Sequence, residues 1–186
     1  MSNPLHEIPL MLFALGLAAQ ITVAVPSDTP PPTPSPSARP QAIEVSDWYA
    51  RRLTLHRRLS YTIIPLFAFQ YAAGRQLWEH GKGGAPSWAR EGHPIGAITI
   101  GTVFGVNTVT GLWNLWDSRA VEEGRARRYL HAASMLVADA GFVWAGAKLS
   151  KEAETSFEKR KLHRNVAITS MAISVTSAVL MKFLNE

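Results

Sequence analysis

The chain has 186 residues, a length typical of one domain, and it contains no cysteine. Disulfides, iron–sulfur clusters, thiolate zinc sites and c-type haem attachment are therefore excluded. The formal net charge is +5, but the basic residues cluster beside apolar segments and are not interleaved with aromatic residues. This placement favours anchoring at a membrane surface, with lipids as partners, and gives no sign of nucleic-acid binding.

The N-terminal quarter of the chain carries targeting signals rather than a folded core. Residues 10–25 are apolar and include small residues near their end, which predicts a signal peptide or signal anchor within residues 1–25. Residues 26–45 are rich in proline, serine and threonine, a composition that predicts a disordered, partly polyproline linker. The folded domain is therefore expected in residues 46–186.

Four apolar segments follow the linker. The second has 23 uncharged residues, enough to cross a hydrocarbon core of ~30 Å at ~1.5 Å per residue. A soluble bundle would show a polar stripe at helical period, but the second and fourth segments have no charged stripe. We predict an all-α fold, a transmembrane antiparallel four-helix bundle, in a cell membrane such as the bacterial inner membrane. The segments are 59–74, 94–116, 129–147 and 165–181.

Local signals predict where these helices begin, bend and end. Ser46 or Asp47 is suited to cap the first helix, and Pro65 is expected to kink it. Loops are predicted at residues 75–92, 117–128 and 148–164, where glycine, proline and mixed charges gather. Tryptophans near most segment ends fit an aromatic belt at two membrane interfaces.

Small and polar residues inside the segments predict close contacts between helices. Small residues would let another helix, or a flat macrocycle, approach closely. They are Gly101-x-x-x-Gly105, Gly96 and Gly111 in the second segment, and Gly141 and Gly146 in the third. Asp139 lies midway along the third segment, and Asn107 in the second is a possible partner. We interpret Asp139 first as hydrogen-bond glue between helices, with proton movement coupled to quinone chemistry as the alternative.

Four histidines each stand at the entrance of one apolar segment: His56, His93, His131 and His163. Three of them follow a leucine and have basic neighbours. A lone histidine at a helix end is more often interfacial than a ligand, but four at matched ends favour a common purpose. One imidazole from each of four helices is the ligand set of two bis-histidine haem sites.

Helix direction predicts how these histidines pair. In an up-and-down bundle, the first and third helices run one way and the second and fourth run the other. His56 and His131 are therefore expected at one membrane face, and His93 and His163 at the opposite face. We predict one haem b between the members of each pair, which would give an electron path across the membrane.

One ligand has an alternative. His80, at the exit of the first helix, is expected on the same face as His93 and His163 and would be able to replace His93. We prefer His93, because Pro94 is well placed to begin a helix.

Basic residues beside the histidines are candidates for a second role in the same sites. The two propionates of a haem are costly to bury unpaired, so nearby guanidinium groups are expected to pair with them. Ordinary interfacial anchoring is the alternative for each. The candidates are Arg57, Arg58, Arg128 and Arg164.

The histidine-centred segments resemble the cytochrome b561 family in its broad sense. Residues 129–149 open with Tyr-Leu-His, pass through two glycines and are similar to the family helix that begins with His. Residues 162–166, Leu-His-Arg-Asn-Val, are similar to the helix that begins with His-Arg, and residues 55–59 have the same character, with Gln70 later. His93-Pro94 resembles the His-Pro start of a helix in some members. The resemblance covers roughly residues 50 to 184 and implies a transmembrane core with two b-type haems.

These features predict a protein that passes electrons across or within a membrane, as part of a redox chain or complex. A redox partner protein or a quinone is the expected partner. The sequence has no nucleophile–base triad, flavin motif or phosphate loop, so we assign no catalytic residue and favour electron transfer over a stand-alone oxidoreductase. The alternative is a haem-free structural or assembly subunit of a membrane complex. The expected assembly is a membrane complex or a homo-oligomer.

Overall fold

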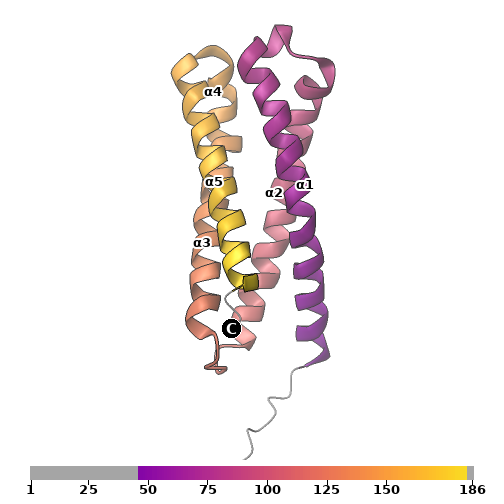
Figure 1. The fold of residues 1–186 in the computed structure, drawn as a ribbon, viewed down its shortest axis with the longest axis vertical. Coiled ribbons are helices and arrows are strands. Elements are labelled where there is room, and N and C mark those ends of the chain that lie inside the picture. The colour runs from indigo at the N-terminus through magenta and orange to yellow at the C-terminus, as the bar shows by residue number, and fades with distance from the viewer. Residues whose placement is uncertain (1–45, 184–186) are drawn as a thin grey trace, which may run out of the picture. The chain divides into compact units, whose positions relative to one another are not determined.

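The computed structural model describes residues 46–183, which belong to one compact unit. All of its regular elements are helices, and the described residues contain no strand (Figure 1). The π-helical turn η1 and the short α4 continue α3 without a gap, so residues 46–183 form four long helical stretches. The elements are α1 (Asp47–Gly84), α2 (Ser87–Asp117), α3 (Arg125–Val143), η1 (Trp144–Leu149), α4 (Ser150–Thr155) and α5 (Phe157–Phe183).

The all-α class is thereby confirmed, and successive stretches alternate in direction (Figure 1). α1 packs mainly against α2, and α3 packs mainly against α5, so the helices form two hairpins with less extensive contact between them. We call these the α1–α2 hairpin and the α3–α5 hairpin. The predicted signal segment 1–25 and linker 26–45 lie outside the described residues.

The helices extend well beyond the apolar segments. The predicted loops 75–92 and 148–164 are therefore largely wrong, whereas the predicted loop 117–128 contains the observed connection. The connections that interrupt the helices shrink to residues 85–86, 118–124 and 156. A helix satisfies its own backbone hydrogen bonds in water as well as in an apolar environment. A helix can therefore continue past the end of its apolar segment into a charged segment. Polarity therefore marked the ends of the apolar segments and not the ends of the helices.

The start of α1 was predicted, whereas that of α2 was not. Ser46 caps α1 as one of the two predicted candidates, since its hydroxyl accepts from the Tyr49 N–H at 3.2 Å. Pro65 keeps a helical backbone, and the break in α1 comes instead at Gly81, with φ 67°. Pro94 lies inside α2 rather than at its start. Each histidine consequently sits more than one turn inside its helix.

Three of the four helical stretches are long and apolar enough to cross a membrane: α2, residues 125–155 and α5. α1 does not meet this standard, because its most apolar stretch includes polar residues such as Ser60, Thr62 and Gln70. Large apolar side chains are exposed around the unit, including Ile98 at 72% and Val143 at 66%. Such a surface is typical of contact with lipid and is consistent with a multi-pass membrane protein.

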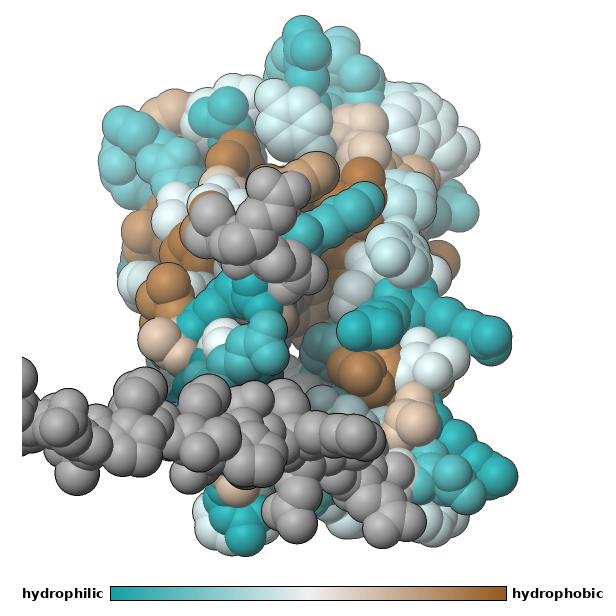
Figure 2. All heavy atoms as spheres, turned by 60° about the horizontal axis from the view of Figure 1, so that its bottom comes forward, coloured by the Kyte–Doolittle hydropathy of each residue, from teal (hydrophilic) through white to brown (hydrophobic). Residues whose placement is uncertain are grey.

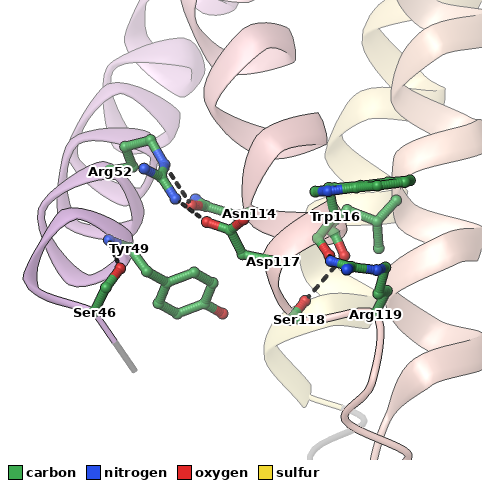
Figure 3. Close-up of polar contacts among 9 residues, drawn as sticks. Ser46, Tyr49, Arg52, Asn114, Trp116, Asp117, Ser118 and Arg119 are labelled. Atoms are coloured by element: carbon green, nitrogen blue, oxygen red, sulfur yellow. Dashed lines mark hydrogen bonds and ion pairs between the residues drawn. The ribbon is translucent and has the colours of Figure 1, made fainter. Parts of the chain in front are cut away.

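A polar cluster joins the start of α1 to the end of α2 (Figure 3). The Arg52 guanidinium donates to Asn114 Oδ1 at 3.3 Å, pairs with the Asp117 carboxylate and lies 4.6 Å from the Trp113 ring centre. Arg119 lies over Trp116 at 4.4 Å. Figure 2 views this end obliquely, with hydrophilic residues in teal around it and hydrophobic residues in brown between them. Arginine stacked on tryptophan suits a membrane–water interface.

Close helix approach depends on some of the predicted glycines, Gly96, Gly111 and Gly141, and not on the others. Gly101 and Gly105 are exposed, and a Cβ added at either would meet nothing within 4 Å. At Gly141, by contrast, an added Cβ would collide with the Ser170 hydroxyl and lie 3.3 Å from Ser170 Cβ. The close contact is therefore inside the α3–α5 hairpin, while the Gly101/Gly105 face of α2 points away from the unit.

Gly141→Ala should reveal this contact. The added methyl group overpacks α3 against α5, so we expect the free energy of unfolding to fall by about 1–3 kcal/mol. Gly146→Ala is the matched control, because Gly146 is helical, has open space at its Cβ position and should gain up to about 1 kcal/mol from helix propensity. Denaturation followed by circular dichroism measures both, and equal effects of the two substitutions would contradict the assigned contact.

Candidate functional site

The four histidines come together as two pairs at opposite ends of the helical unit. The ring centres of His56 and His131 are 6.5 Å apart, with the rings at 82°. Those of His93 and His163 are 6.2 Å apart, with the rings at 64°. Each pair joins the two hairpins, α1 to α3 in the first and α2 to α5 in the second. These are the pairs that helix direction predicts.

The ring spacing suits a metal ion held between two imidazoles. A metal-bound imidazole nitrogen lies about 2 Å from the metal and about 1 Å from its own ring centre, so two rings on opposite sides of one ion have centres about 6 Å apart. Both pairs have this separation. Edge-to-face packing of two rings also gives centre separations of about 4.5–7 Å, and both pairs have that orientation.

Three of the histidines have one ring nitrogen held by an oxygen atom of a neighbouring helix. Nδ1 of His56 donates to the Asn107 carbonyl at 3.1 Å, and Nδ1 of His163 donates to the Ala145 carbonyl at 3.0 Å. Nδ1 of His131 lies 2.9 Å from the Ser177 hydroxyl. A carbonyl only accepts, so the proton of neutral His56 and His163 sits on Nδ1 and Nε2 keeps its lone pair. This is the state in which imidazole binds a metal.

His93 differs from the other three. Its Nε2 is 3.4 Å from Nε2 of the Gln70 carboxamide, while its Nδ1 is buried and has no hydrogen-bond partner among the described residues. Oε1 of Gln70 is also buried without a partner. The two pairs are therefore alike in spacing and unlike in how their rings are held.

A common register underlies both pairs. Each helical stretch carries one of these histidines. In each hairpin, the residue fourteen positions after the histidine of one helix contacts the histidine of the other helix. The residues seven and eleven positions after each histidine also face the interior, and all are buried except the partly buried Phe142. Spacings of seven, eleven and fourteen residues mark one helix face. The sets are Ile63, Ile100, Ala138 and Ser170; Phe67, Phe104, Phe142 and Ser174; and Gln70, Asn107, Ala145 and Ser177.

Glycines cradle one ring of each pair. A Cβ added at Gly111 would lie 3.1 Å from Cε1 of His56, and one at Gly74 would lie 3.2 Å from Cε1 of His93. Each glycine stands eighteen residues after the histidine of its own helix. The absence of side chains at these two positions lets the imidazoles lie against the neighbouring backbone.

The interior between the pairs is aromatic and apolar. Phe67, Phe104 and Phe142 form a triad whose ring centres lie 4.9 to 5.9 Å apart. The triad belongs to a core that includes Ile63 and Ile100. It separates the two histidine pairs with side chains that offer no hydrogen bond to water.

The other predicted site residues have varied positions. His80 is exposed and bonds the Gln76 carbonyl of its own helix at 3.2 Å, so the structure brings His93 rather than His80 to His163. His6 lies outside the described residues. Arg57 and Arg58 are exposed beside His56, and exposed Arg164 lies 4.9 Å from the Trp78 ring centre.

Arg128 holds the connection between α2 and α3. Its guanidinium donates to the carbonyls of Glu123 and Val121 at 2.5 Å each and to that of Ser118 at 3.4 Å. These bonds occupy much of its donor capacity, so the structure gives Arg128 a clear role in loop closure. Its predicted pairing with a propionate stays a prediction.

Asp139 joins the two hairpins. Its carboxylate accepts from the Thr108 hydroxyl of α2, while its second oxygen is buried without a partner among residues 46–183. The predicted partner Asn107 instead donates to the Ser60 hydroxyl at 3.2 Å. The helix that Asp139 contacts was thus predicted, but the residue was not.

Sequence reasoning missed the residues that hold the histidines, above all Gln70, Ser177 and the two glycines. The sequence does contain a signal for these residues, because aligning the four helices on their histidines places the buried positions in common columns. The signal is hard to recognise, because residues of different chemistry occupy the same column. The Asn107 and Ala145 acceptors are backbone carbonyls, which no residue type identifies.

Within the described part of the chain, no group of three or more His, Asp or Glu residues could hold a metal ion together. No known protein-family model matches this chain, and neither curated proteins nor solved structures yield a significant match to it.

Gly111→Ala tests the cradle around His56. The added Cβ would crowd Cε1 of His56, so the ring must shift and its bond to the Asn107 carbonyl should weaken, with a stability loss of about 1 kcal/mol. Side-chain ¹⁵N NMR of the histidines should show changed His56 signals and unchanged His163 signals. Gly101→Ala, with open space at the same helix, is the control; an unmoved His56 signal in Gly111→Ala would contradict the cradle.

Proposed function

We propose that this protein is an integral membrane four-helix bundle that binds two b-type haems and passes electrons across or within the membrane. One haem would be held by His56 and His131, and the other by His93 and His163. The cytochrome b561-like histidine phrases support the same assignment. A haem bound in this way supplies a one-electron carrier with two axial imidazoles.

The spacing of the rings is the observation that carries this proposal. Two independent pairs have centre separations of 6.5 and 6.2 Å, which are suited to two imidazoles on one iron. A bis-histidine site needs only two protein ligands, in contrast to a tetrahedral structural zinc site, which needs four. The donor set therefore favours haem over a simple zinc site.

The surrounding residues would orient the ligands and exclude water. The carbonyls of Asn107 and Ala145 hold the ring protons of His56 and His163, so that each Nε2 stays available. The phenylalanine triad keeps the interior between the sites dry. Arg57, Arg58 and Arg164 stand near the histidines in sequence and remain the candidates for pairing with propionates, with Arg128 limited by its loop contacts.

The separation of the sites agrees with a transmembrane path. On α1, His56 belongs to one pair, and Gln70 and Gly74 contact the other. These positions are 14 and 18 residues from His56, or about 21 and 27 Å of helix. A hydrocarbon core is about 30 Å thick, so the pairs would lie near its two edges. We infer a cell membrane, such as a bacterial inner membrane, with a redox partner protein or quinone on each side.

A haem-free structural or assembly subunit is the second candidate function. It is favoured by the outward face of α2 at Gly101 and Gly105, where nothing within the described residues covers the glycines. Small residues in lipid allow another helix to approach closely. In this alternative, the histidine pairs would only pack the two hairpins together.

Optical spectra of the purified protein, oxidised and dithionite-reduced, separate the two candidates. With adequate haem supplied during expression, we expect a bis-imidazole spectrum and about two haems per chain. His131→Ala and His163→Ala should each leave about one haem, and these should be different haems. Each substitution removes one of two axial ligands.

His80→Ala is the matched control, because His80 is exposed and should leave both haems in place. Absence of any bis-imidazole signal from the wild-type protein would refute the proposed function. Loss of the same single haem in both ligand variants would refute the pairing.

A further inference from the structure

One position in the common register differs in chemistry from its equivalents. Asn107 and Ala145 present backbone carbonyls to the opposite histidine, and Ser177 presents a hydroxyl. The fourth equivalent residue is Gln70, whose carboxamide nitrogen is the atom nearest to the His93 ring nitrogen, at 3.4 Å. Gln70 therefore occupies the place of an oxygen acceptor while presenting a donor.

Two unused polar atoms flank this contact. Oε1 of Gln70 and Nδ1 of His93 are both buried and have no hydrogen-bond partner among the described residues. Buried polar atoms without partners cost free energy and call for a specific explanation. Both atoms belong to the one contact in the register that departs from the other three.

The surroundings keep the Gln70 carboxamide at this place. Gln70 is 7% exposed. A Cβ added at Gly96 of α2 would collide with Oε1, so the glycine leaves room for the carboxamide between the helices. The side chain can exchange its two terminal atoms by a half-turn, but it has no open solvent to move into.

We propose that Gln70 is the positioning residue for His93 as a haem ligand, an inference that rests on the proposed function. A half-turn of the carboxamide presents Oε1 to the ring nitrogen that Gln70 already contacts. That nitrogen, Nε2, then carries the proton and donates it to Oε1, which leaves the buried Nδ1 unprotonated. Nδ1 would then be the iron ligand of His93, whereas Nε2 would be the ligand of His56 and His163, whose Nδ1 atoms are held by carbonyls. Both unused atoms acquire a role, and all four histidines are then held by an oxygen.

The two sites are consequently unequal. A backbone carbonyl within a helix cannot reverse its direction, whereas a carboxamide can present either a donor or an acceptor. The His93 ligand is therefore held by a group that substitution can remove, and the His56 ligand is held by one that substitution cannot remove directly. Changes at Gln70 should act on the His93/His163 site alone.

The test uses Gln70→Met, which keeps the length of the side chain without a carbonyl acceptor, and Gln70→Glu, which keeps an oxygen acceptor. Each is made in the full chain and in the His131→Ala and His163→Ala backgrounds, so that the sites are read separately. Haem titration measures affinity, and redox titration with electron paramagnetic resonance measures the midpoint potential and ligand field. Gln76→Met, on the same helix beyond the site, is the control.

We expect Gln70→Met to weaken haem binding at the His93/His163 site by about 10- to 100-fold and to leave the other site unchanged. Gln70→Glu should restore binding and lower the midpoint potential of that haem only, because a carboxylate is a stronger acceptor and places negative charge beside the ligand. Gln76→Met should match the wild type. A purely packing role for Gln70 would not produce rescue by glutamate with a lowered potential.

The outcomes separate this inference from the proposed function. A wild-type protein that binds no haem defeats both. A wild-type protein with two haems, whose Gln70→Met variant keeps both affinities and both potentials, defeats the inference alone. Equal weakening of the two sites by Gln70→Met would also overturn it, because the proposed contact serves His93 only.

Discussion

Reciprocal contacts of half-buried imidazoles set the register of the helices. Each hairpin contains two histidines, one in each helix. Each histidine contacts the residue that lies fourteen positions after the histidine of the other helix. In antiparallel helices, such reciprocal contacts fix the alignment, since sliding one helix along the other would break both together. The same alignment brings the interior positions of all four helices to common levels.

The two hairpins meet this constraint with different packing. In the α1–α2 hairpin, the interior positions hold large apolar residues, with Ile63 and Phe67 facing Ile100 and Phe104. In the α3–α5 hairpin they hold alanine and serine, and Gly141 lies directly against Ser170. Small residues bring two helices close together, and large ones hold them apart. Phe142 is the exception in the second hairpin, and it completes the aromatic core formed by the first.

The histidine pairs could be predicted because they depend only on helix number and direction. The helix ends could not, because residues such as Arg90 and Lys159 are charged and yet helical. The outward orientation of Gly101 and Gly105 could not be predicted either. A GxxxG motif shows that one helix face lacks side chains, but it does not identify the helix that packs against that face. The acceptors are the hardest case. Gln70 and Ala145 occupy the same position relative to the histidines of their helices, but they differ in polarity and size. A hydropathy pattern therefore does not show that the two positions are equivalent.

The histidines lie between the two hairpins, which also meet at other levels; near His163, for example, the Trp78 ring of α1 lies 5.5 Å from the Phe157 ring of α5. Between the pairs, α3 meets the α1–α2 hairpin through Phe142 and through the bond from Thr108 to Asp139. Toward the two ends, the imidazoles face each other across the hairpins at more than 6 Å, too far for a direct hydrogen bond between ring nitrogens that lie about 1 Å from their ring centres. Each pair thus brings two metal-binding groups together without joining them. A single ion between the rings would add a connection at each of these levels, and its binding free energy would then stabilise the association of the hairpins. Haem binding and the assembly of the four helices would in that case be linked equilibria, and loss of haem would weaken the contact between the hairpins.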